Sequence, residues 1–496
     1  MRITGILIIF FILNISNVFA QSNYYWLFFK NETSLNSETK RLCNKFNGKI
    51  RLVGKSKWFN AAFVNIYDIK TLNKISKSKS ILKIEKSKNY HKSKQLVNTD
   101  TSNFYYTKKQ LGILGLEKFH QKGFTGKNIT LALFDAGFYR VDSLLAFDSL
   151  RKRNGILATK DFVENNSNVY NDDSHGMYVL SIISGYVKDS LQGAAPGVNY
   201  LLARTEDVSS EKHLEEFNWI KALEWADSIG VDIIHSSLGY SVFDTLQGDY
   251  SYNDMDGEST IITRAAQMAF KRGIFITNSA GNEGAKKWKY ITAPCDGKDV
   301  LCVGAVDSNL VKSNFSSFGP SSDGRVKPDV MAMGTLVTIA GTNNEIKRGN
   351  GTSFSGPLIA GFVACLKQKY PNISNTILLE AIRKSGSLYN YPSDSMGYGI
   401  PDILRADSII QKKLEIKNQI YQNQEIIIFP NPAKDRFVIK SALKIKTIEI
   451  FDIYGKRVLV LKNNETVNIE KLTSDNYSLK ITCFNGFSIY KRLVKI

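Results

Sequence analysis

The chain has 496 residues, of which 43% are hydrophobic and 22% are charged. This composition is typical of globular proteins and excludes a collagen-like, coiled-coil or wholly disordered chain, and the length predicts about two to four domains. The formal net charge of +19 comes from residues 21–100 and 411–496, because residues 101–410 are nearly neutral. That middle part lacks basic clusters interleaved with aromatic residues, so we expect no nucleic-acid partner and interpret the basic ends as solvated surface.

Residues 1–20 have the features of an export signal peptide. Arg2 supplies a positive start, Ile3–Leu13 is almost continuously apolar, and Val18-Phe19-Ala20 places small residues at the cleavage positions. A membrane anchor is the alternative, but the apolar run is shorter than the roughly 20 residues that span a bilayer. No later segment is longer and apolar, so we expect no transmembrane segment in the mature chain.

Residues 21–104 are interpreted as a small α+β domain followed by a linker. The domain has strand patterns at 24–29, 58–64 and 81–84 and a helical pattern at 68–75. Residues 86–103 are polar and aperiodic, which is typical of an exposed linker.

Residues 105–410 alternate between strand and helix patterns. The strand candidates are 129–134, 200–203, 232–235, 274–277 and 300–306, and the helix candidates are 175–186, 213–229, 258–272, 353–369 and 374–384. This alternation predicts an α/β fold with a mostly parallel sheet and helices on both faces. Active sites in such sheets lie at the carboxyl ends of the strands.

Residues 411–424 are polar again and are interpreted as a second linker. Residues 425–496 then show short strands separated by turns, at 437–440, 447–453, 457–461, 477–482 and 487–494. This pattern predicts a small all-β sandwich at the end of the chain.

The five cysteines are an odd number for an exported chain. Only Cys295 and Cys302 are close in sequence, and they are either a disulfide across a small loop or two buried thiols beside a strand. Cys365 lies in an apolar helical pattern and is assigned to the core. No pair has CxxC spacing, so we expect no metal site.

Four residues could carry chemistry, and each also has a structural explanation. His175 precedes Gly176 at a predicted helix start, where its ring could face a cleft or be incidental. Asp135 follows a buried strand and could orient an imidazole or cap a turn. Ser353 begins a helix, where a nucleophile or an N-cap serine could stand. Asn282 follows a strand in a glycine loop and could donate to an oxyanion or shape a turn.

The order of these residues along the chain narrows the chemistry. Ser353 follows all five histidines, which excludes the Ser–Asp–His order of α/β-hydrolase lipases and esterases, and its surroundings lack the last glycine of GxSxG. His235 lies in an apolar strand and is expected to be a core residue. The order Asp135, His175, Ser353 is the one that subtilisin-type peptidases use.

Residues 105–410 resemble a subtilisin-like (subtilase, S8) serine peptidase domain. Six sequence blocks carry the resemblance in the family's order: 132–138, 174–176, 237–239, 279–282, 351–357 and 397–402. Two of the blocks depart from the usual pattern, with Met177 after the histidine block and Phe354-Ser355 after the serine.

The resemblance implies a mechanism and a set of site residues. Ser353 would be the nucleophile, His175 the general acid and base, Asp135 its orienting carboxylate and Asn282 an oxyanion donor. Substrate would lie along the segments Ser237-Leu238-Gly239 and Ala280-Gly281. We expect no cofactor; structural calcium is common in the family, although no ligand set is evident here.

The two ends resemble accessory parts of exported proteins. Residues 24–85 resemble the inhibitory propeptide of subtilases, which would be cut away within or near 86–105; an extra surface domain that stays attached is the alternative. Residues 425–496 resemble the type A C-terminal sorting domain of type IX secretion cargo; an ordinary binding module is the alternative.

The sequence therefore predicts a secreted serine endopeptidase, located outside the cell or on its surface beyond the outer membrane. Its partners would be protein or peptide substrates and the type IX secretion machinery. A catalytically inactive subtilase-like binding protein at the surface is the alternative function.

Overall fold

The computed structural model describes residues 23–87, 96–98, 105–208, 214–241, 250–422, 426–441, 443–484, 486 and 488–496. The predicted export signal at 1–20 lies outside the described residues. The chain forms two compact units, Met1–Asp407 and Ser408–Ile496, and each is described by itself. Among the described residues, no helix combines the length and the apolar character of a membrane span.

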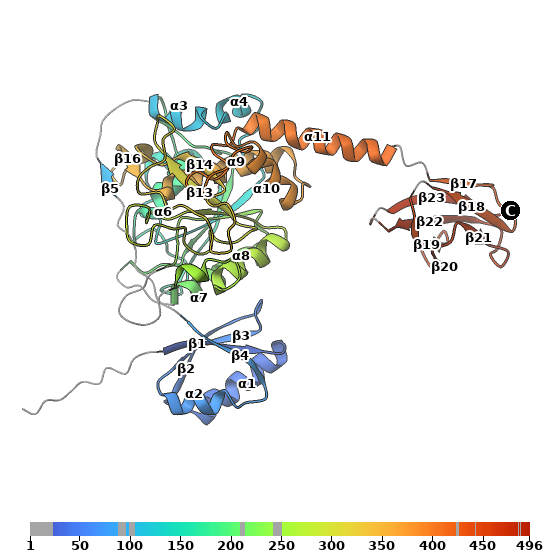
Figure 1. Ribbon diagram of the computed structural model, residues 1–496, viewed down its shortest axis with the longest axis horizontal. Helices are drawn as coiled ribbons and strands as arrows, with labels where there is room; N and C mark the ends of the chain where they lie inside the picture. The colour runs from blue at the N-terminus through green and yellow to red at the C-terminus, as the bar shows by residue number, and fades with distance from the viewer. Residues whose placement is uncertain are drawn as a thin grey trace, which may run out of the picture. The chain divides into compact units, whose positions relative to one another are not determined.

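The first unit begins with a small α+β domain, as predicted (Figure 1). Its antiparallel sheet has the order β2-β3-β1-β4 and carries two helices. The elements are β1 (Asn23–Phe29), α1 (Glu32–Lys45), β2 (Ile50–Ser56), β3 (Ala61–Ile66), α2 (Ile69–Ile75) and β4 (Ile81–Lys86). Side chains of β1 alternate between the faces, so Tyr25, Leu27 and Phe29 pack with α1 while Trp26 lies on the other face.

A seven-stranded parallel sheet forms the centre of this unit, with the order β14-β13-β12-β11-β6-β10-β7. The strands are β6 (Thr130–Asp135), β7 (Ile156–Asp161), β10 (Asn199–Arg204), β11 (Ile233–Ser236), β12 (Phe275–Ser279), β13 (Leu301–Val306) and β14 (Val330–Met333). Except in the edge strand β7, their residues are buried almost throughout, as is expected of a sheet that is covered on both faces. The predicted α/β architecture is confirmed.

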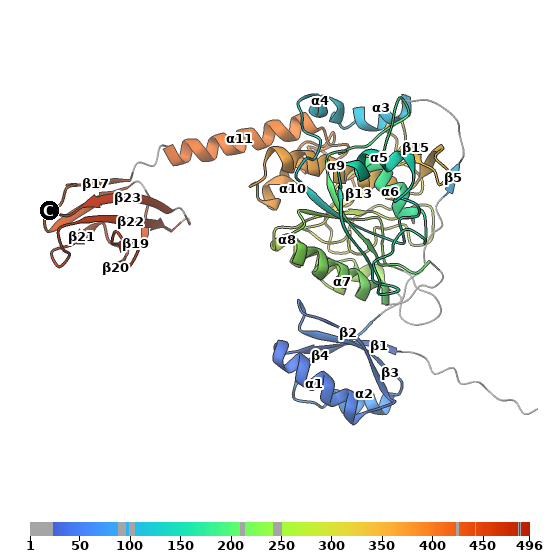
Figure 2. The same ribbon diagram turned by 180° about the vertical axis from the view of Figure 1, so that it is seen from behind.

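Helices cover both faces of this sheet (Figure 2). Helices α7 (Leu214–Ile229) and α8 (Ile261–Lys271) pack together on one face, whereas α6 (His175–Ser184) and α9 (Thr352–Lys369) pack together on the other. The remaining helices are α3 (Tyr105–Gly112), α4 (Leu116–Gln121), α5 (Asp148–Lys152), α10 (Asn375–Lys384) and α11 (Ile403–Gln422), with the 3-10 turns η1 (Leu145–Phe147) and η2 (Tyr252–Asp254).

Two segments that we interpreted as linkers contain regular structure. Strand β5 (Leu96–Asn98) lies within 86–103 and pairs antiparallel with β16 (Ile346–Asn350), which in turn pairs with β15 (Val337–Ala340). The predicted linker 411–424 is helical as far as Gln422, because α11 continues through it. This stretch is rich in Lys and Gln and has no Gly or Pro, so nothing in it stops a helix.

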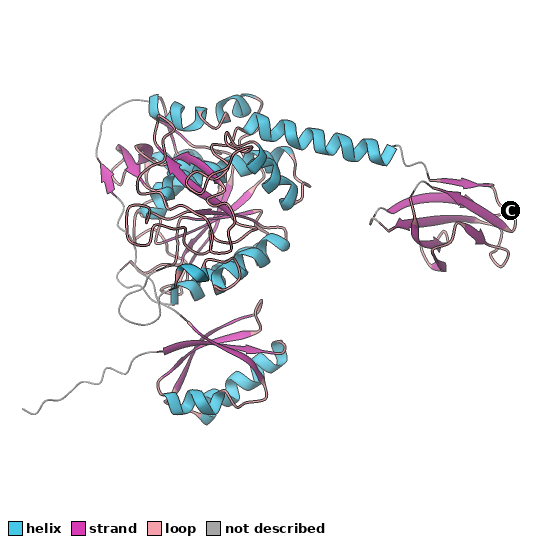
Figure 3. Ribbon diagram, in the orientation of Figure 1, coloured by secondary structure: helices cyan, strands magenta, loops and turns pink. Residues whose placement is uncertain are grey.

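The second unit is all-β, with two antiparallel sheets (Figure 3). One sheet has the order β17-β18-β21 and the other β20-β19-β22-β23. Its strands are β17 (Ile427–Phe429), β18 (Arg436–Lys440), β19 (Ile445–Phe451), β20 (Arg457–Lys462), β21 (Thr466–Asn468), β22 (Asn476–Cys483) and β23 (Ser488–Val494). Phe437, Ile448, Leu479 and Leu493 belong to its own core, so the predicted all-β module is confirmed.

Candidate active site

Asp135 is the last residue of β6 and is completely buried. Its Oδ1 accepts a hydrogen bond from the backbone N–H of Ala136 at 2.8 Å and lies 2.6 Å from Nδ1 of His175. Its Oδ2 is buried without a hydrogen-bond partner among the described residues. A buried carboxylate oxygen without a partner is costly, so the contact with His175 is the main polar contact that this carboxylate makes to a side chain.

His175 is the first residue of α6, and only 11% of its side chain is exposed. The next residue must be glycine, because a Cβ on Gly176 would lie 2.5 Å from the carbonyl oxygen of Gly137 and 2.8 Å from Cβ of Asp135. This close approach brings the start of α6 against the end of β6. The imidazole therefore lies against the carboxylate of Asp135.

Ser353 lies in the first turn of α9, on the same side of the sheet as His175. The ring of its neighbour Phe354 stacks with the imidazole of His175, with 6.4 Å between the ring centroids. The Ser353 hydroxyl donates to the backbone carbonyl of Ser237 at 3.3 Å. Because a hydroxyl has one proton, it must turn away from Ser237 before it can donate to an imidazole.

The side-chain carbonyl of Asn282 is held by the start of α9. Its Oδ1 accepts from the backbone N–H of Thr352 at 2.8 Å and from the Thr352 hydroxyl at 3.0 Å. Since the N–H of Thr352 needs an acceptor, these contacts fix which end of the amide is oxygen. The Nδ2 group consequently points away from Thr352 and is available to a ligand.

Two backbone segments run beside Ser353. Ser237 and Leu238 follow β11, and Ala280 and Gly281 follow β12. Both segments approach Thr292, since a Cβ on Gly239 would lie 2.1 Å from the Thr292 hydroxyl and one on Gly281 would lie 3.2 Å from it. The absence of side chains at these two glycines keeps the backbone of both segments close together.

A disulfide lies beneath this region. Cys295 and Cys302 are joined, with their Cα atoms 5.0 Å apart, which decides between the two alternatives that the sequence left open. Both cysteines are buried with Ala280 and Ile291. The bond therefore anchors the segment behind Ala280.

The sequence analysis missed two supporting residues, Arg204 and Thr352. The buried guanidinium of Arg204, at the end of β10, donates to the carbonyl of Ala136 at 3.2 Å and pairs with Asp161 at 2.9 Å. The sequence signal that could have identified Arg204 was a cationic residue at the carboxyl end of a buried strand. Thr352 stood in the serine block, but its contact with Asn282 joins residues 70 positions apart.

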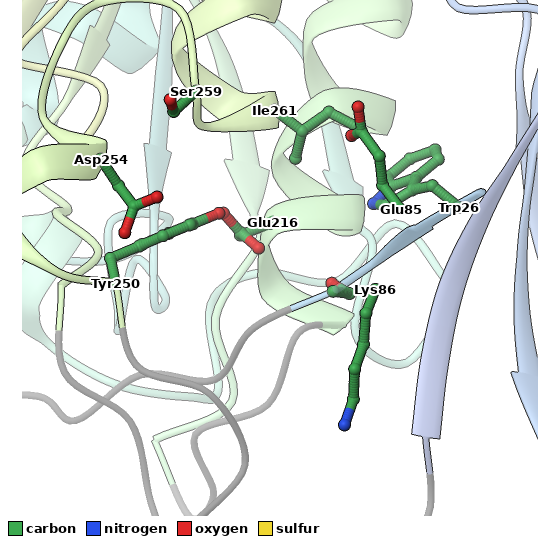
Figure 4. A pocket seen from close by; sticks show the side chains of 9 residues that line it. Trp26, Glu85, Lys86, Glu216, Tyr250, Asp254, Ser259 and Ile261 are labelled. Atoms are coloured by element: carbon green, nitrogen blue, oxygen red, sulfur yellow. The ribbon is translucent and has the colours of Figure 1, made fainter. Parts of the chain in front are cut away.

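A cavity of about 330 Å³ lies at the junction of the N-terminal domain with α7 and α8 (Figure 4). It is lined by Trp26, Glu85, Lys86, Ser87, Glu216, Tyr250, Asp254, Ser259 and Ile261. The Tyr250 hydroxyl points at Glu216 and donates to it at 2.8 Å. Burial, followed by the charge of Glu216, raises the pKa of Tyr250 well above its usual range. None of the four candidate catalytic residues lines this cavity.

No group of three or more His, Cys, Asp or Glu residues within the described ranges has the arrangement of a metal site.

Solved structures share the fold. Fervidolysin from Fervidobacterium pennivorans, a keratinolytic enzyme related to subtilisin, aligns with a TM-score of 0.60 at 16% identity, over 96% of this chain and 76% of that one. The epidermin leader peptide processing serine protease from Staphylococcus aureus aligns with a TM-score of 0.57 at 20% identity, over 78% of this chain and 97% of that one. Subtilisin NAT from Bacillus subtilis subsp. natto is 26% identical over 406 residues, which cover 79% of this chain and 94% of that protein.

The fold and these relatives define a serine-type endopeptidase. Residues 126–399 match the model of the subtilase family (Peptidase S8), and the chain belongs to that family. Residues 427–496 match the model of a secretion-system C-terminal sorting domain. The resemblances of residues 105–410 and 425–496 are therefore confirmed. The sorting domain assigns the protein to the cell surface or the medium.

Proposed function

We propose that the protein is a secreted serine endopeptidase in which Ser353, His175 and Asp135 form the catalytic triad and Asn282 binds the oxyanion. The observation that carries the proposal is the contact of 2.6 Å between Asp135 Oδ1 and His175 Nδ1, next to the first turn of α9, in which Ser353 lies and Phe354 stacks with the imidazole. This contact fixes Nδ1 as the protonated nitrogen, so Nε2 is free to accept a proton.

The reaction would proceed by acyl transfer. The Ser353 hydroxyl turns from the Ser237 carbonyl, loses its proton to Nε2 of His175 and attacks the scissile carbonyl, forming a tetrahedral intermediate. The new oxyanion is stabilised by Nδ2 of Asn282 and the backbone N–H of Ser353. His175 then protonates the leaving amine as the C–N bond breaks, which leaves an acyl ester on Ser353. Water, deprotonated by His175, attacks this ester, and His175 returns the proton to the Ser353 oxygen as the acid is released.

Substrate would lie extended between the two segments that flank Ser353. The carbonyl of Ser237 accepts from the Ser353 hydroxyl at 3.3 Å, and the N–H of Gly281 donates to the Thr352 hydroxyl at 3.2 Å, so both segments lie beside the nucleophile, where an extended peptide would have to run. Protein and peptide chains are therefore the proposed substrates. Activity against proteins distinguishes this proposal from an esterase, since serine peptidases also cleave activated esters.

The N-terminal domain is proposed to be an inhibitory propeptide. Its sheet packs on α7 through stacked Phe63 and Phe217 rings, whose centroids are 5.1 Å apart. Glu224 of α7 accepts from the Ser56 hydroxyl at 2.6 Å and from the backbone N–H of Trp58 at 3.1 Å. Arg264 of α8 pairs with Glu85 at 2.7 Å. A docked domain whose last strand leads toward the cleavable segment supports this role.

The C-terminal unit is proposed to direct export through the type IX secretion machinery and to be removed during secretion. Its match to a secretion-system sorting domain supports this proposal.

The test compares purified full-length protein with its Ser353→Ala variant. Both are incubated with denatured casein, with and without a fluorophosphonate, and intact and fragment masses are measured. We expect casein cleavage, release of the N-terminal domain and fluorophosphonate labelling in the wild type alone. If neither protein cleaves casein even after the N-terminal domain has been removed, the alternative function, a catalytically inactive binding protein, becomes the better hypothesis.

A further inference from the structure

A buried histidine that the proposed mechanism does not use lies directly behind the nucleophile. His235 is in β11 and has no exposed surface. Its Nδ1 lies 2.9 Å from the hydroxyl of Thr277, its partner on β12, and its Nε2 lies 3.0 Å from the hydroxyl of Ser237. Burial lowers the pKa of His235 to about 3, so the ring is neutral, with one donor and one acceptor nitrogen.

The helix sequence decides which nitrogen donates. In an α-helix the carbonyl of Ser353 would accept from the residue four positions later, and that residue is Pro357, which has no N–H. The Ser237 hydroxyl donates to this carbonyl at 3.2 Å in its place. Because buried carbonyls need donors, the single proton of Ser237 is committed to Ser353.

The remaining hydrogen bonds then have only one consistent direction. Ser237 can only accept from His235, so Nε2 carries the ring proton. Nδ1 is therefore the acceptor, and the Thr277 hydroxyl donates to it. The result is a chain of three hydrogen bonds that begins at Thr277 and ends on the backbone of the nucleophile.

The opposite direction leaves Ser353 without its donor. If Nδ1 carried the proton, Thr277 would accept from it and donate to the Ile234 carbonyl, 3.3 Å away. Ser237 would then donate to Nε2, and the Ser353 carbonyl would lose the hydrogen bond from Ser237. The direction of the chain thus determines whether the first turn of α9 is tied to β11.

We propose that His235 is a positioning residue for the nucleophile, acting through the hydroxyl of Ser237 on the backbone carbonyl of Ser353. It does not touch the reacting atoms. It fixes the proton of Ser237 toward α9, and so fixes the placement of the Ser353 side chain and of its oxyanion-binding N–H. This inference rests on the proposed role of Ser353 as nucleophile.

The decisive variant is Thr277→Val, which removes the first donor of the chain while keeping the shape of the side chain. We expect kcat on a chromogenic peptide to fall about fivefold, the effect of one ordinary hydrogen bond, with KM unchanged within about twofold. Fluorophosphonate labelling of Ser353 should slow by a similar factor. Thr277→Ser restores the hydroxyl and should recover most of kcat. The acid limb of the pH profile should not move, because Asp135 and His175 are untouched.

Two further variants separate positioning from general destabilisation. Ile276→Val shortens the neighbouring buried side chain on β12, which packs in the core with α7 and α8, and should lower the melting temperature without changing kcat. His235→Leu should lower kcat about tenfold or more. If His235→Leu does not fold, the comparison of Thr277→Val with Thr277→Ser still tests the positioning role. All variants are expressed as the full chain, activated identically and quantified by active-site titration.

The outcomes distinguish this inference from the proposed function. A wild type that is not labelled at Ser353 contradicts the proposed function itself. A labelled wild type with Thr277→Val and His235→Leu retaining full kcat contradicts the positioning role alone. Equal losses in Thr277→Val and Thr277→Ser also overturn it, because the hydroxyl would then be irrelevant.

Discussion

Thr352 determines which way the amide of Asn282 faces. Its backbone N–H and hydroxyl both donate to Oδ1, which leaves Nδ2 as the end of the amide that does not face Thr352. The same contact satisfies an N–H at the start of α9, where helical partners are missing. Asn282 therefore has a structural contact and a proposed catalytic contact, one at each end of its amide.

These two contacts can be separated by mutation. Asn282→Asp keeps an acceptor for Thr352 and loses the N–H donor, whereas Asn282→Ala loses both. We expect both variants to lower kcat about 100- to 1,000-fold with a modest change in KM, because the oxyanion donor is lost. Only Asn282→Ala should also lower the melting temperature. Steady-state kinetics and thermal unfolding measure the two effects, and near wild-type kcat in Asn282→Asp would refute the oxyanion role.

The candidate residues could be predicted from sequence because chain order restricts a serine, a histidine and an aspartate together. The hydrogen bonds that hold these residues in place could not be predicted. Ser237 and Ser353 are 116 positions apart, and the hydroxyl contact between them depends on Pro357 having removed the helical donor. No local pattern in the sequence predicts such a contact.

Among the elements, the loop closed by Cys295 and Cys302 holds a buried carboxyl group. Burial raises the pKa of Asp296 to about 6, although Thr263 and the N–H of Gly257 donate to it. This folded-state pKa is higher than the ~3.9 of an unfolded chain. The stabilising contribution of Asp296 is therefore complete below about pH 4 and is lost as the pH rises through about 6.

Asp296→Asn should remove this pH dependence. Between pH 4 and pH 7, the free energy of unfolding of the wild type should fall relative to the variant by on the order of 2 to 3 kcal/mol. Chemical denaturation of both, in a Ser353→Ala background that prevents autolysis, measures the difference. Asp299→Asn, in the same loop, is the matched control. A difference that stays constant with pH would contradict the prediction.

Helix α7 is the element that binds the N-terminal domain, and Glu224 is its main polar contact. Removing this acceptor leaves the Ser56 hydroxyl and the Trp58 N–H without their partner. We expect Glu224→Ala to weaken inhibition of the activated enzyme by a peptide of residues 21–95 about tenfold or more, because hydrogen bonds to charged groups are strong. Glu224→Gln keeps an acceptor and should weaken it less. Unchanged inhibition constants would contradict the proposed interface.

The main elements were predictable where buried strands are long and apolar, as in β6 and β13. The predictions were less successful where structure depends on distant partners. Strand β5 has a polar setting and exists through its pairing with β16, more than 240 positions later. Helix α1 was missed because its sequence is mostly polar, and α11 was predicted only in part because polar residues at 411–424 were interpreted as a linker.

At the scale of the whole molecule, the pairing of β5 with β16 restricts the positions at which the N-terminal domain can be cleaved from the mature enzyme. Strand β16 runs to Asn350, three residues before Ser353, and β5 covers its edge. An uncovered edge strand is a liability, so the mature enzyme should keep β5. We expect the mature chain to begin after Ser87 and no later than Leu96. N-terminal sequencing of the active enzyme checks this, and a start beyond Asn98 would contradict it.

The second unit has a core built from its own residues, including Phe437, Ile448 and Leu479. A fold that supplies its own core does not depend on the identity of what precedes it. Its address function should therefore be portable: an unrelated, non-proteolytic enzyme extended by residues 408–496 and given an export signal should be carried out of the same cells. The chain would then be a hydrolase joined to a sorting domain that can be transferred to other proteins.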